Sequence, residues 1–383
     1  MPKNILVLGG GVYHIPLVKK AVELGHKTLA VSFLENDPAL KYASASIAIS
    51  STDVAALSTL IQSENIDAVI TTASDWNTFS QAELNKRFGF IGVQPEQVKA
   101  VSEKERFNLL LEKLLLPNPE TNEVILSPTV FNDFKRKGKH IFKPEKGSGS
   151  ADVFTTEAIF PAHLNGQSFL AQTFIEGLEF GGQAIIEKGE VIFVALSRKE
   201  LINEVVPFAH VIGLPEMDGF TENVKAQLQK IVTEIDFISG TINFDIRENE
   251  RELYIIDLSL RLSGNGLIEA INESYGINLF DYHIRQVLDE PRFLEFQLKK
   301  KIAVSIVLGT AKAEVNLAEI REKITFYLNQ TKVEISELVW DDIRESEPFT
   351  KSKNRIGHAI FIADSEVELN QLLLKIKTLL GFN

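Results

Sequence analysis

The first ninety residues alternate short apolar runs with segments of helical periodicity. The runs lie at 5–8, 28–33 and 67–72, and segments with apolar residues at helical spacing lie between them, at 17–24 and 54–63. Strands that alternate with helices in this way pair in parallel, because each crossover helix packs on a face of the sheet. The pattern therefore predicts a small, doubly wound parallel sheet at the N-terminus.

From about residue 140 the chain changes to short strands joined by glycine-containing loops. A helical stretch that begins at Gln94 and ends at 117–119 separates this part from the N-terminal sheet. A further helix is expected near 221–236. Strands are expected at 141–144, 169–174, 181–186, 190–196, 241–246 and 253–260.

The C-terminal residues resemble a separate small α+β unit. Its expected strands lie at 301–309, 323–328 and 358–363, and its closing helix lies at 366–380. A chain of 383 residues is also too long for one ordinary core. We therefore expect a protein of mixed α/β and α+β class, divided into three units at 1–98, 99–295 and 296–383.

Composition limits the partners of the protein. The formal net charge of -12 leaves no broad basic surface for nucleic acid or anionic lipid, and the absence of cysteine excludes disulfides and thiolate chemistry. The initial apolar run breaks into glycine at Gly9, and no run approaches the ~20 apolar residues of a membrane helix. We expect a soluble, cytoplasmic protein that binds neither nucleic acid nor membranes.

Three glycines at 9–11 follow the first expected strand and precede a helix, where dinucleotide-binding folds seat a pyrophosphate. In the G-x-G-x-x-G pattern counted from Gly9, however, the third glycine position holds His14. A tight turn in a doubly wound unit explains the glycines as well. Contact with a small carboxylate substrate is a third interpretation.

A second glycine cluster follows a lysine on an expected strand. Lys143 precedes a loop that contains Gly147, Ser148, Gly149 and Ser150. Glycine lets backbone N–H groups converge on phosphate oxygens, and an adjacent lysine adds a positive charge for the same anion. The segment therefore indicates a phosphate site, although a solvated hairpin loop with a surface lysine would look similar.

Two further segments carry polar groups at strand ends. Residues 172–179 offer hydrogen-bond acceptors at the end of an expected strand: backbone groups suited to a nucleotide base and a carboxylate suited to a ribose diol. Any strand followed by an acidic turn would look similar. The second segment comprises two expected adjacent strands whose polar residues share one parity and hence one face: Asn243, Asp245, Asp257, Ser259 and Arg261. Unpaired charges are costly to desolvate, so this face favours magnesium with nucleotide phosphates, the alternative being a structural Asp–Arg network.

Taken in order, these segments resemble the ATP-grasp superfamily, especially the carboxylate–amine ligase branch related to biotin carboxylase and the large subunit of carbamoyl-phosphate synthase. The motifs cover roughly residues 1–290. The resemblance implies an N-terminal Rossmann-like pre-ATP-grasp unit at 1–98, a nucleotide-binding ATP-grasp unit of two α+β subdomains at 99–295 and a small C-terminal unit.

The resemblance also implies roles for particular residues. Lys104 and Lys143 would hold ATP phosphates together with the loop residues Gly147, Ser148, Gly149 and Ser150; Gln172, Thr173 and Ile175 would contact the base, and Glu179 the ribose. Asp245 and Asp257 would bind Mg²⁺, which Mn²⁺ could replace, and Arg261 would act with Lys143 in catalysis by steadying an acyl phosphate. Ser259 stands where the family has asparagine, so it is a weaker expected metal ligand.

The implied activity is an ATP-dependent ligase that activates a carboxylate as an acyl phosphate and couples it to a nucleophile, an amine by the resemblance. An ATP-binding protein without turnover and a dinucleotide-dependent oxidoreductase are the alternatives. The expected partners are small carboxylates and amines, and a homodimer is compatible with the resemblance. The substrates themselves are not identified by the sequence; candidates to line their pocket are Asp75, Ser197, Arg198, Lys199, His210 and Asn265.

Overall fold

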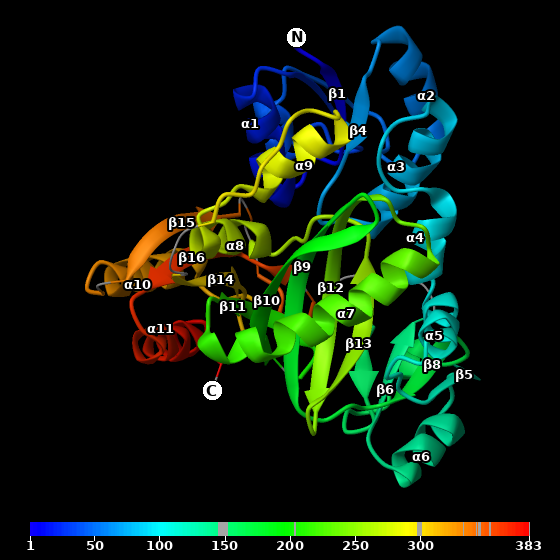
Figure 1. Cartoon of the computed structure of the whole chain (residues 1–383). Helices are drawn as coiled ribbons and strands as arrows, with labels where there is room; N and C mark the ends of the chain where they lie inside the picture. The colour runs from blue at the N-terminus through cyan, green and yellow to red at the C-terminus, as the bar shows by residue number, and fades with distance from the viewer. Residues whose placement is uncertain are drawn as a thin grey trace.

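The computed structural model of the chain describes residues 1–144, 152–202, 204–296, 301–331, 333–341, 343, 346–351 and 354–382. Figure 1 shows the N-terminal sheet above a large sheet, with a smaller sheet and the C-terminal elements on opposite sides of the large one. The mixed α/β and α+β class predicted from the sequence is confirmed. Within the described part of the chain, no helix is long and apolar enough to cross a membrane.

The N-terminal sheet is parallel, with strand order β3-β2-β1-β4. Its strands are β1 (Asn4–Leu8), β2 (Lys27–Val31), β3 (Ala45–Ile47) and β4 (Ala68–Ile70), and its helices are α1 (Ile15–Glu23), α2 (Val54–Ser63) and α3 (Asp75–Phe88). Residues 5–8 of β1 are completely buried, since helices cover both faces of the sheet. The predicted doubly wound sheet is therefore confirmed.

Two helices and a four-stranded sheet follow. The predicted helical stretch is two helices, α4 (Pro95–Ser102) and α5 (Lys104–Lys113), because Glu103 adopts an extended conformation between them. The sheet has the order β5-β8-β6-β7 and packs against α6 (Pro128–Lys137). Its strands are β5 (Thr121–Ile125), β6 (His140–Pro144), β7 (Phe154–Thr155) and β8 (Ser168–Thr173). Aromatic packing stabilises this subdomain; Phe142 and Phe154 stack with ring centroids 5.2 Å apart.

The large sheet has eight strands in the order β13-β12-β9-β10-β11-β14-β16-β15. Its first five strands in this order are β13 (Glu252–Ser259), β12 (Ser239–Asn249), β9 (Leu178–Glu187), β10 (Glu190–Ile202) and β11 (Val206–Ile212). The predicted helix near 221–236 is α7 (Asp218–Glu234), which packs on β10. The sequence analysis did not identify β11.

The C-terminal strands continue this sheet. They are β14 (Ile302–Leu308), β15 (Glu334–Trp340) and β16 (Gly357–Ala363); β14 pairs with β11, and α11 (Glu366–Leu379) closes the chain as expected. The three-unit division of the chain stays a prediction, and one sheet runs through the second and third of these units.

The strand expected at 323–328 was wrong. These residues belong to α10 (Leu317–Leu328), which begins where the Asn316 side chain accepts a hydrogen bond from the backbone N–H of Glu319. The buried side chains of Ile324 and Leu328 lie four positions apart, the spacing of one helix face. The cap and this spacing override the β-branched and aromatic composition that suggested a strand.

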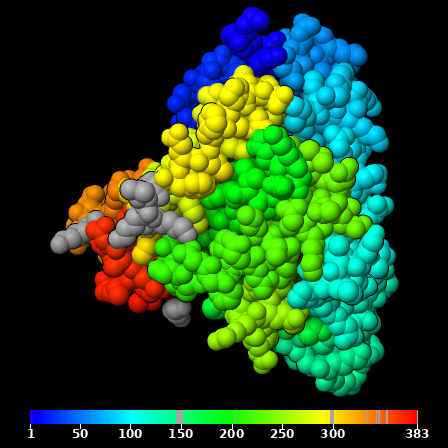
Figure 2. Space-filling view, in the orientation of Figure 1, coloured from blue at the N-terminus to red at the C-terminus, as the bar shows by residue number. Residues whose placement is uncertain are grey.

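Two helices join the N-terminal sheet to the large one. α8 (Leu267–Tyr275) packs on β11 and β14, and α9 (Leu279–Val287) packs against α1, β4 and β12. The space-filling view shows the yellow segment that contains α9 lying directly against the blue N-terminal part (Figure 2). The carboxyl ends of the N-terminal strands are thereby held beside the loop that follows β13.

Candidate active site

The candidate site is built on the paired strands β12 and β13. Their register places Asn243 opposite Ser259 and Asp245 opposite Asp257. Because directly opposed residues project from the same face, the shared face predicted from parity is confirmed for these four residues. Arg261 lies just after the end of β13.

The polar face continues across the sheet onto strands that sequence reasoning did not connect. Asp245 pairs with Gly181 on β9, Gly181 pairs with Ser197 on β10, and Lys199 pairs with His210 on β11. A Cβ at Gly181 would lie 3.2 Å from the His210 ring and 3.3 Å from the Asp245 carboxylate. The glycine therefore lets polar side chains of neighbouring strands approach each other over its backbone.

Lys199 and Arg247 form a compact ion network with two predicted ligand residues. The Lys199 Nζ lies 2.6 Å from Glu179 and 2.9 Å from Asp245, and Arg247 lies 2.7 Å from the other oxygen of Glu179. Burial would lower the pKa of Lys199, but the carboxylates of Asp245 and Glu179 outweigh it and raise the pKa above its ordinary value. Both oxygens of Glu179, the predicted ribose ligand, are thus engaged by cations of the protein.

Two predicted phosphate lysines converge on the edge of β13. Lys143, on β6, donates from its Nζ to the backbone oxygen of Ile256 at 3.3 Å, and Lys104, at the start of α5, donates to the backbone oxygen of Pro144 at 2.9 Å. Burial lowers the pKa of Lys143 and nearby Lys104 lowers it further, whereas Asp257 opposes this effect. A bound polyanion would relieve the repulsion between the two ammonium groups.

Asp245 and Asp257 are the candidate metal ligands. Desolvation by the surrounding protein raises the pKa of Asp257, and the nearby carboxylates of Asp245 and Asp75 raise it further. The residue is nevertheless exposed to solvent. A divalent cation between the opposed carboxylates would remove this repulsion, so the residues present fit Mg²⁺. Among the residues that the structure describes, no three acidic or histidine side chains form a complete cation site, so phosphate or water oxygens would have to supply the remaining ligands.

The predicted base-binding residues lie where β8 leaves the small sheet. The Gln172 side chain donates to Thr121 Oγ1 at 2.9 Å, and the backbone N–H of Thr173 donates to the Glu120 oxygen at 3.0 Å. The backbone oxygen of Ile175 accepts from Arg247 at 3.1 Å. Ile175 thus contacts the ion network, whereas the polar groups of Gln172 and Thr173 bond to Thr121 and Glu120. The loop residues Gly147, Ser148, Gly149 and Ser150 lie outside the described residues.

The first glycine cluster is filled by protein. A Cβ at Gly9 would lie 2.4 Å from the ring of His14, and one at Gly10 would lie 2.6 Å from the side chain of Asp37. Burial lowers the pKa of His14 to about 4, which keeps the ring neutral. These contacts favour the tight-turn interpretation of the glycines over a pyrophosphate site.

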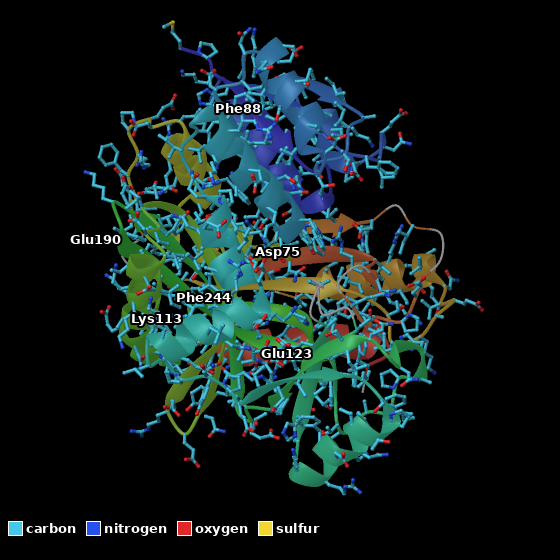
Figure 3. All side chains as sticks on the ribbon, turned by 90° about the vertical axis from the view of Figure 1, so that its right-hand side faces the viewer. Asp75, Phe88, Lys113, Glu123, Glu190 and Phe244 are labelled. Carbon is cyan, nitrogen blue, oxygen red and sulfur yellow. The ribbon has the colours of Figure 1, made fainter. Side chains whose placement is uncertain are left out.

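Of the other pocket candidates, Asp75 reaches the polar face most directly. Its Oδ1 accepts from Ser259 Oγ at 2.8 Å and from Arg261 Nε at 2.7 Å. Burial would raise the pKa of Asp75, but Arg261 outweighs this effect and holds the pKa below its ordinary value. Figure 3 shows Asp75 at the lower end of the N-terminal unit, above the small sheet that carries Glu123.

The remaining candidates lie on or beside the same sheet. Ser197 Oγ donates to the Gly181 oxygen at 3.1 Å and lies 3.0 Å from His210 Nδ1, so it accepts from that nitrogen. Arg198 instead pairs with Glu216 and Glu366, and the Asn265 backbone oxygen accepts from Ser305 Oγ. Sequence reasoning missed Arg247, although it continues the parity of Asn243 and Asp245.

Comparisons with known proteins concern the domain and the fold that carry this site. Residues 101–265 match the model of the ATP-grasp domain. Phosphoribosylglycinamide synthetase from Anaerococcus prevotii superposes with a TM-score of 0.76 at 21% identity, covering 99% of this chain and 98% of that one. L-amino acid ligase from Bacillus licheniformis gives 0.78 at 16% identity, covering 98% and 97%.

Carboxyaminoimidazole ribonucleotide synthase from Aspergillus clavatus, in complex with ATP, gives a TM-score of 0.80 at 14% identity and covers 99% and 98% of the two chains. None of the curated protein sequences compared with the chain matches it. The fold is thus shared over the whole chain, and the motif residues from Lys104 to Arg261 fall within the matched domain. The match to the family model identifies residues 101–265 as an ATP-grasp domain.

Proposed function

We propose that this protein is an ATP-dependent ligase that activates a carboxylate as an acyl phosphate and couples it to an amine, releasing ADP and phosphate. The observation that carries the proposal is the convergence of Lys104, Lys143, Asp245, Asp257 and Arg261 around one end of β12 and β13. Two cations for phosphates, two opposed carboxylates for a divalent ion and a further cation suit phosphoryl transfer to an acid.

In the proposed reaction an oxygen of the substrate carboxylate attacks the γ-phosphorus of ATP, the bond to the β–γ bridging oxygen breaks, and ADP leaves. Lys104 and Lys143 hold the phosphates and offset charge on the transferring group. Bound Mg²⁺, held by Asp245 and Asp257, supplies further charge neutralisation. The amine then attacks the acyl carbon, phosphate leaves with the bonding pair, and the nitrogen loses one proton.

The finer assignments are part of the proposal. We place the base near Gln172, Thr173 and Ile175 and the ribose near Glu179. A ribose hydroxyl that donates to Glu179 would have to replace the ion pair of this carboxylate with Lys199 or with Arg247. The related folds support a small-molecule substrate, since the named relatives include a synthetase of phosphoribosylglycinamide and a ligase of amino acids.

Two observations favour a second candidate, an ATP-binding protein without turnover. Ser259 replaces the asparagine expected in the family, and Lys199 already neutralises Asp245. Such a protein would bind nucleotide with Mg²⁺ but would not transfer phosphate.

An acid-dependent turnover assay separates the two functions. Pure protein is incubated with ATP, Mg²⁺ and pooled carboxylic and amino acids, and ADP and phosphate are measured; hydroxylamine in place of the amine traps an acyl phosphate as a hydroxamate. Acid-dependent ADP and hydroxamate, both absent with Lys143→Ala, support the ligase. Tight nucleotide binding without ADP from any pool would support the second candidate instead.

A further inference from the structure

The segment after β4 is docked onto the loop after β13 through its backbone. Thr72 forms a parallel bridge with Leu262, and the backbone N–H of Ala73 donates to the Leu262 oxygen at 3.1 Å. The Thr72 hydroxyl lies 3.3 Å from the backbone oxygens of both Leu262 and Ser263. Main-chain hydrogen bonds thus join the N-terminal unit to the edge of the candidate site.

The docked segment contains a strained residue. Ala73 has a φ of 57°, a left-handed conformation that is unfavourable for a residue with a Cβ. A Cβ at Gly264 would lie 2.9 Å from the Ala73 Cβ, so the close approach depends on glycine at that position. Strain and close packing together fix where the next residues lie, including Asp75 at the start of α3.

Asp75 uses one oxygen to hold two groups of the site. Because the Ser259 hydroxyl donates to Asp75, the lone pairs of the Ser259 oxygen stay available on the polar face. Arg261 donates from Nε to Asp75 and from Nη1 to the Leu262 oxygen at 3.2 Å, whereas no described residue accepts from Nη2. The guanidinium is therefore held along one side, and its remaining edge is left for an anion.

We propose that Asp75 is a positioning residue of the ligase site. From the N-terminal unit, its carboxylate orients the open edge of Arg261 toward the acyl phosphate and the Ser259 oxygen toward the divalent cation. This inference rests on the proposed function. It means that the N-terminal unit, through Asp75, contributes to phosphoryl transfer.

Asp75→Asn tests the role because it keeps the size of the side chain and removes the charge that fixes Arg261. We expect kcat to fall tenfold or more, the KM for ATP to stay within twofold, and the affinity of the nucleotide-bound protein for Mn²⁺, followed by electron paramagnetic resonance, to fall severalfold. Asp67→Asn is the matched control, since Asp67 is a carboxylate of the same unit that binds Lys3 and the Asn4 backbone away from the site. Asp67→Asn should leave kcat, the KM for ATP and the Mn²⁺ affinity unchanged.

A double-mutant cycle separates positioning from direct binding. If Asp75 acts on the metal through Ser259, then Ser259→Ala should weaken Mn²⁺ binding in the wild type and have no further effect in Asp75→Asn. Additive losses would show that Asp75 is itself a ligand and would overturn the proposal. An increase confined to the KM of the acid or amine would also overturn it, because it would make Asp75 a substrate contact.

The test also holds if Asp75→Asn does not fold or if the wild-type protein shows no turnover. If Asp75→Asn fails to fold, Asp75→Glu keeps the charge on a longer side chain, and an unchanged kcat and Mn²⁺ affinity in that variant would refute the requirement for this geometry. If the wild type forms no acid-dependent ADP, the ligase proposal fails, but the Mn²⁺ cycle still decides whether Asp75 orients Ser259.

Discussion

Lys199→Met should destabilise the fold far more than removal of a surface lysine. The Nζ of Lys199 makes ion pairs of 2.6 Å with Glu179 and 2.9 Å with Asp245, and only 3% of the side chain is exposed. Methionine has a similar length and no charge, so the substitution removes the cation with little change in volume.

The expected loss follows from the partners that remain. Glu179 keeps its contact with Arg247, but Asp245 loses the only ion pair that it makes with a described residue. Breaking a fully buried pair costs about 3–5 kcal/mol, and the Asp245 side chain is 27% exposed and thus partly hydrated. We expect the free energy of unfolding to fall by about 2–4 kcal/mol.

The assay is urea unfolding at pH 7, followed by circular dichroism, with Lys113→Met as the matched control. Lys113 also makes a 2.6 Å pair, with Glu234, but its side chain is 67% exposed, and surface pairs contribute at most about 1 kcal/mol. Lys113 is labelled in Figure 3. Equal losses for the two variants would refute the argument, because burial would then make no difference to the ion pair.

Four further predictions concern single sites. Lys143→Ala should abolish ADP formation while circular dichroism stays unchanged, because the described hydrogen bond of its ammonium is to a backbone oxygen, that of Ile256; unchanged turnover would remove Lys143 from the site. Asp257→Asn should raise the Mg²⁺ concentration needed for half-maximal nucleotide binding, measured by calorimetry, since the cation loses an anionic ligand. Gly177→Ala should cost about 3 kcal/mol or more in urea unfolding, because the added Cβ would meet the Glu248 backbone oxygen at 1.9 Å; Gly25→Ala, with open space around it, should cost only about 1 kcal/mol. Stability should fall from pH 6.5 toward pH 4, because the unfolded chain protonates His14 near pH 6.5 and the folded one only near pH 4; the share of this ring is about 2 kcal/mol at pH 5, and His14→Gln should lose it.

Local patterns of apolar and polar residues predicted the N-terminal strands and the pairing of β12 with β13. The N-terminal strands follow from apolar runs separated by helical segments, and the β12–β13 register follows from the parity of Asn243, Asp245, Asp257 and Ser259. Both patterns are set by neighbours within a few residues, or within one hairpin, so the sequence contains them directly.

The remaining site contacts join residues that are far apart in the sequence. Asp75 meets Ser259 across 184 positions, and Arg247 meets Glu179 across 68. Such pairs depend on how two units dock or on the order of strands in a sheet, and neither is encoded in local periodicity. The α10 error has another origin, since intrinsic β preference gave way to a cap and a buried helical face.

Because the eight-stranded sheet is continuous, the C-terminal strands cover an edge of the sheet that would otherwise be exposed. β14 covers the main-chain donors and acceptors along Ala209 to Ile212 of β11, four residues that are almost fully buried. If the chain were shortened before residue 302, this strand would become an apolar edge with unpaired N–H and C=O groups. Such an edge recruits strands from other molecules, so the loss of the tail would favour aggregation as well as lower stability. During synthesis β11 also emerges long before β14, which leaves this edge exposed until the last part of the chain has been made.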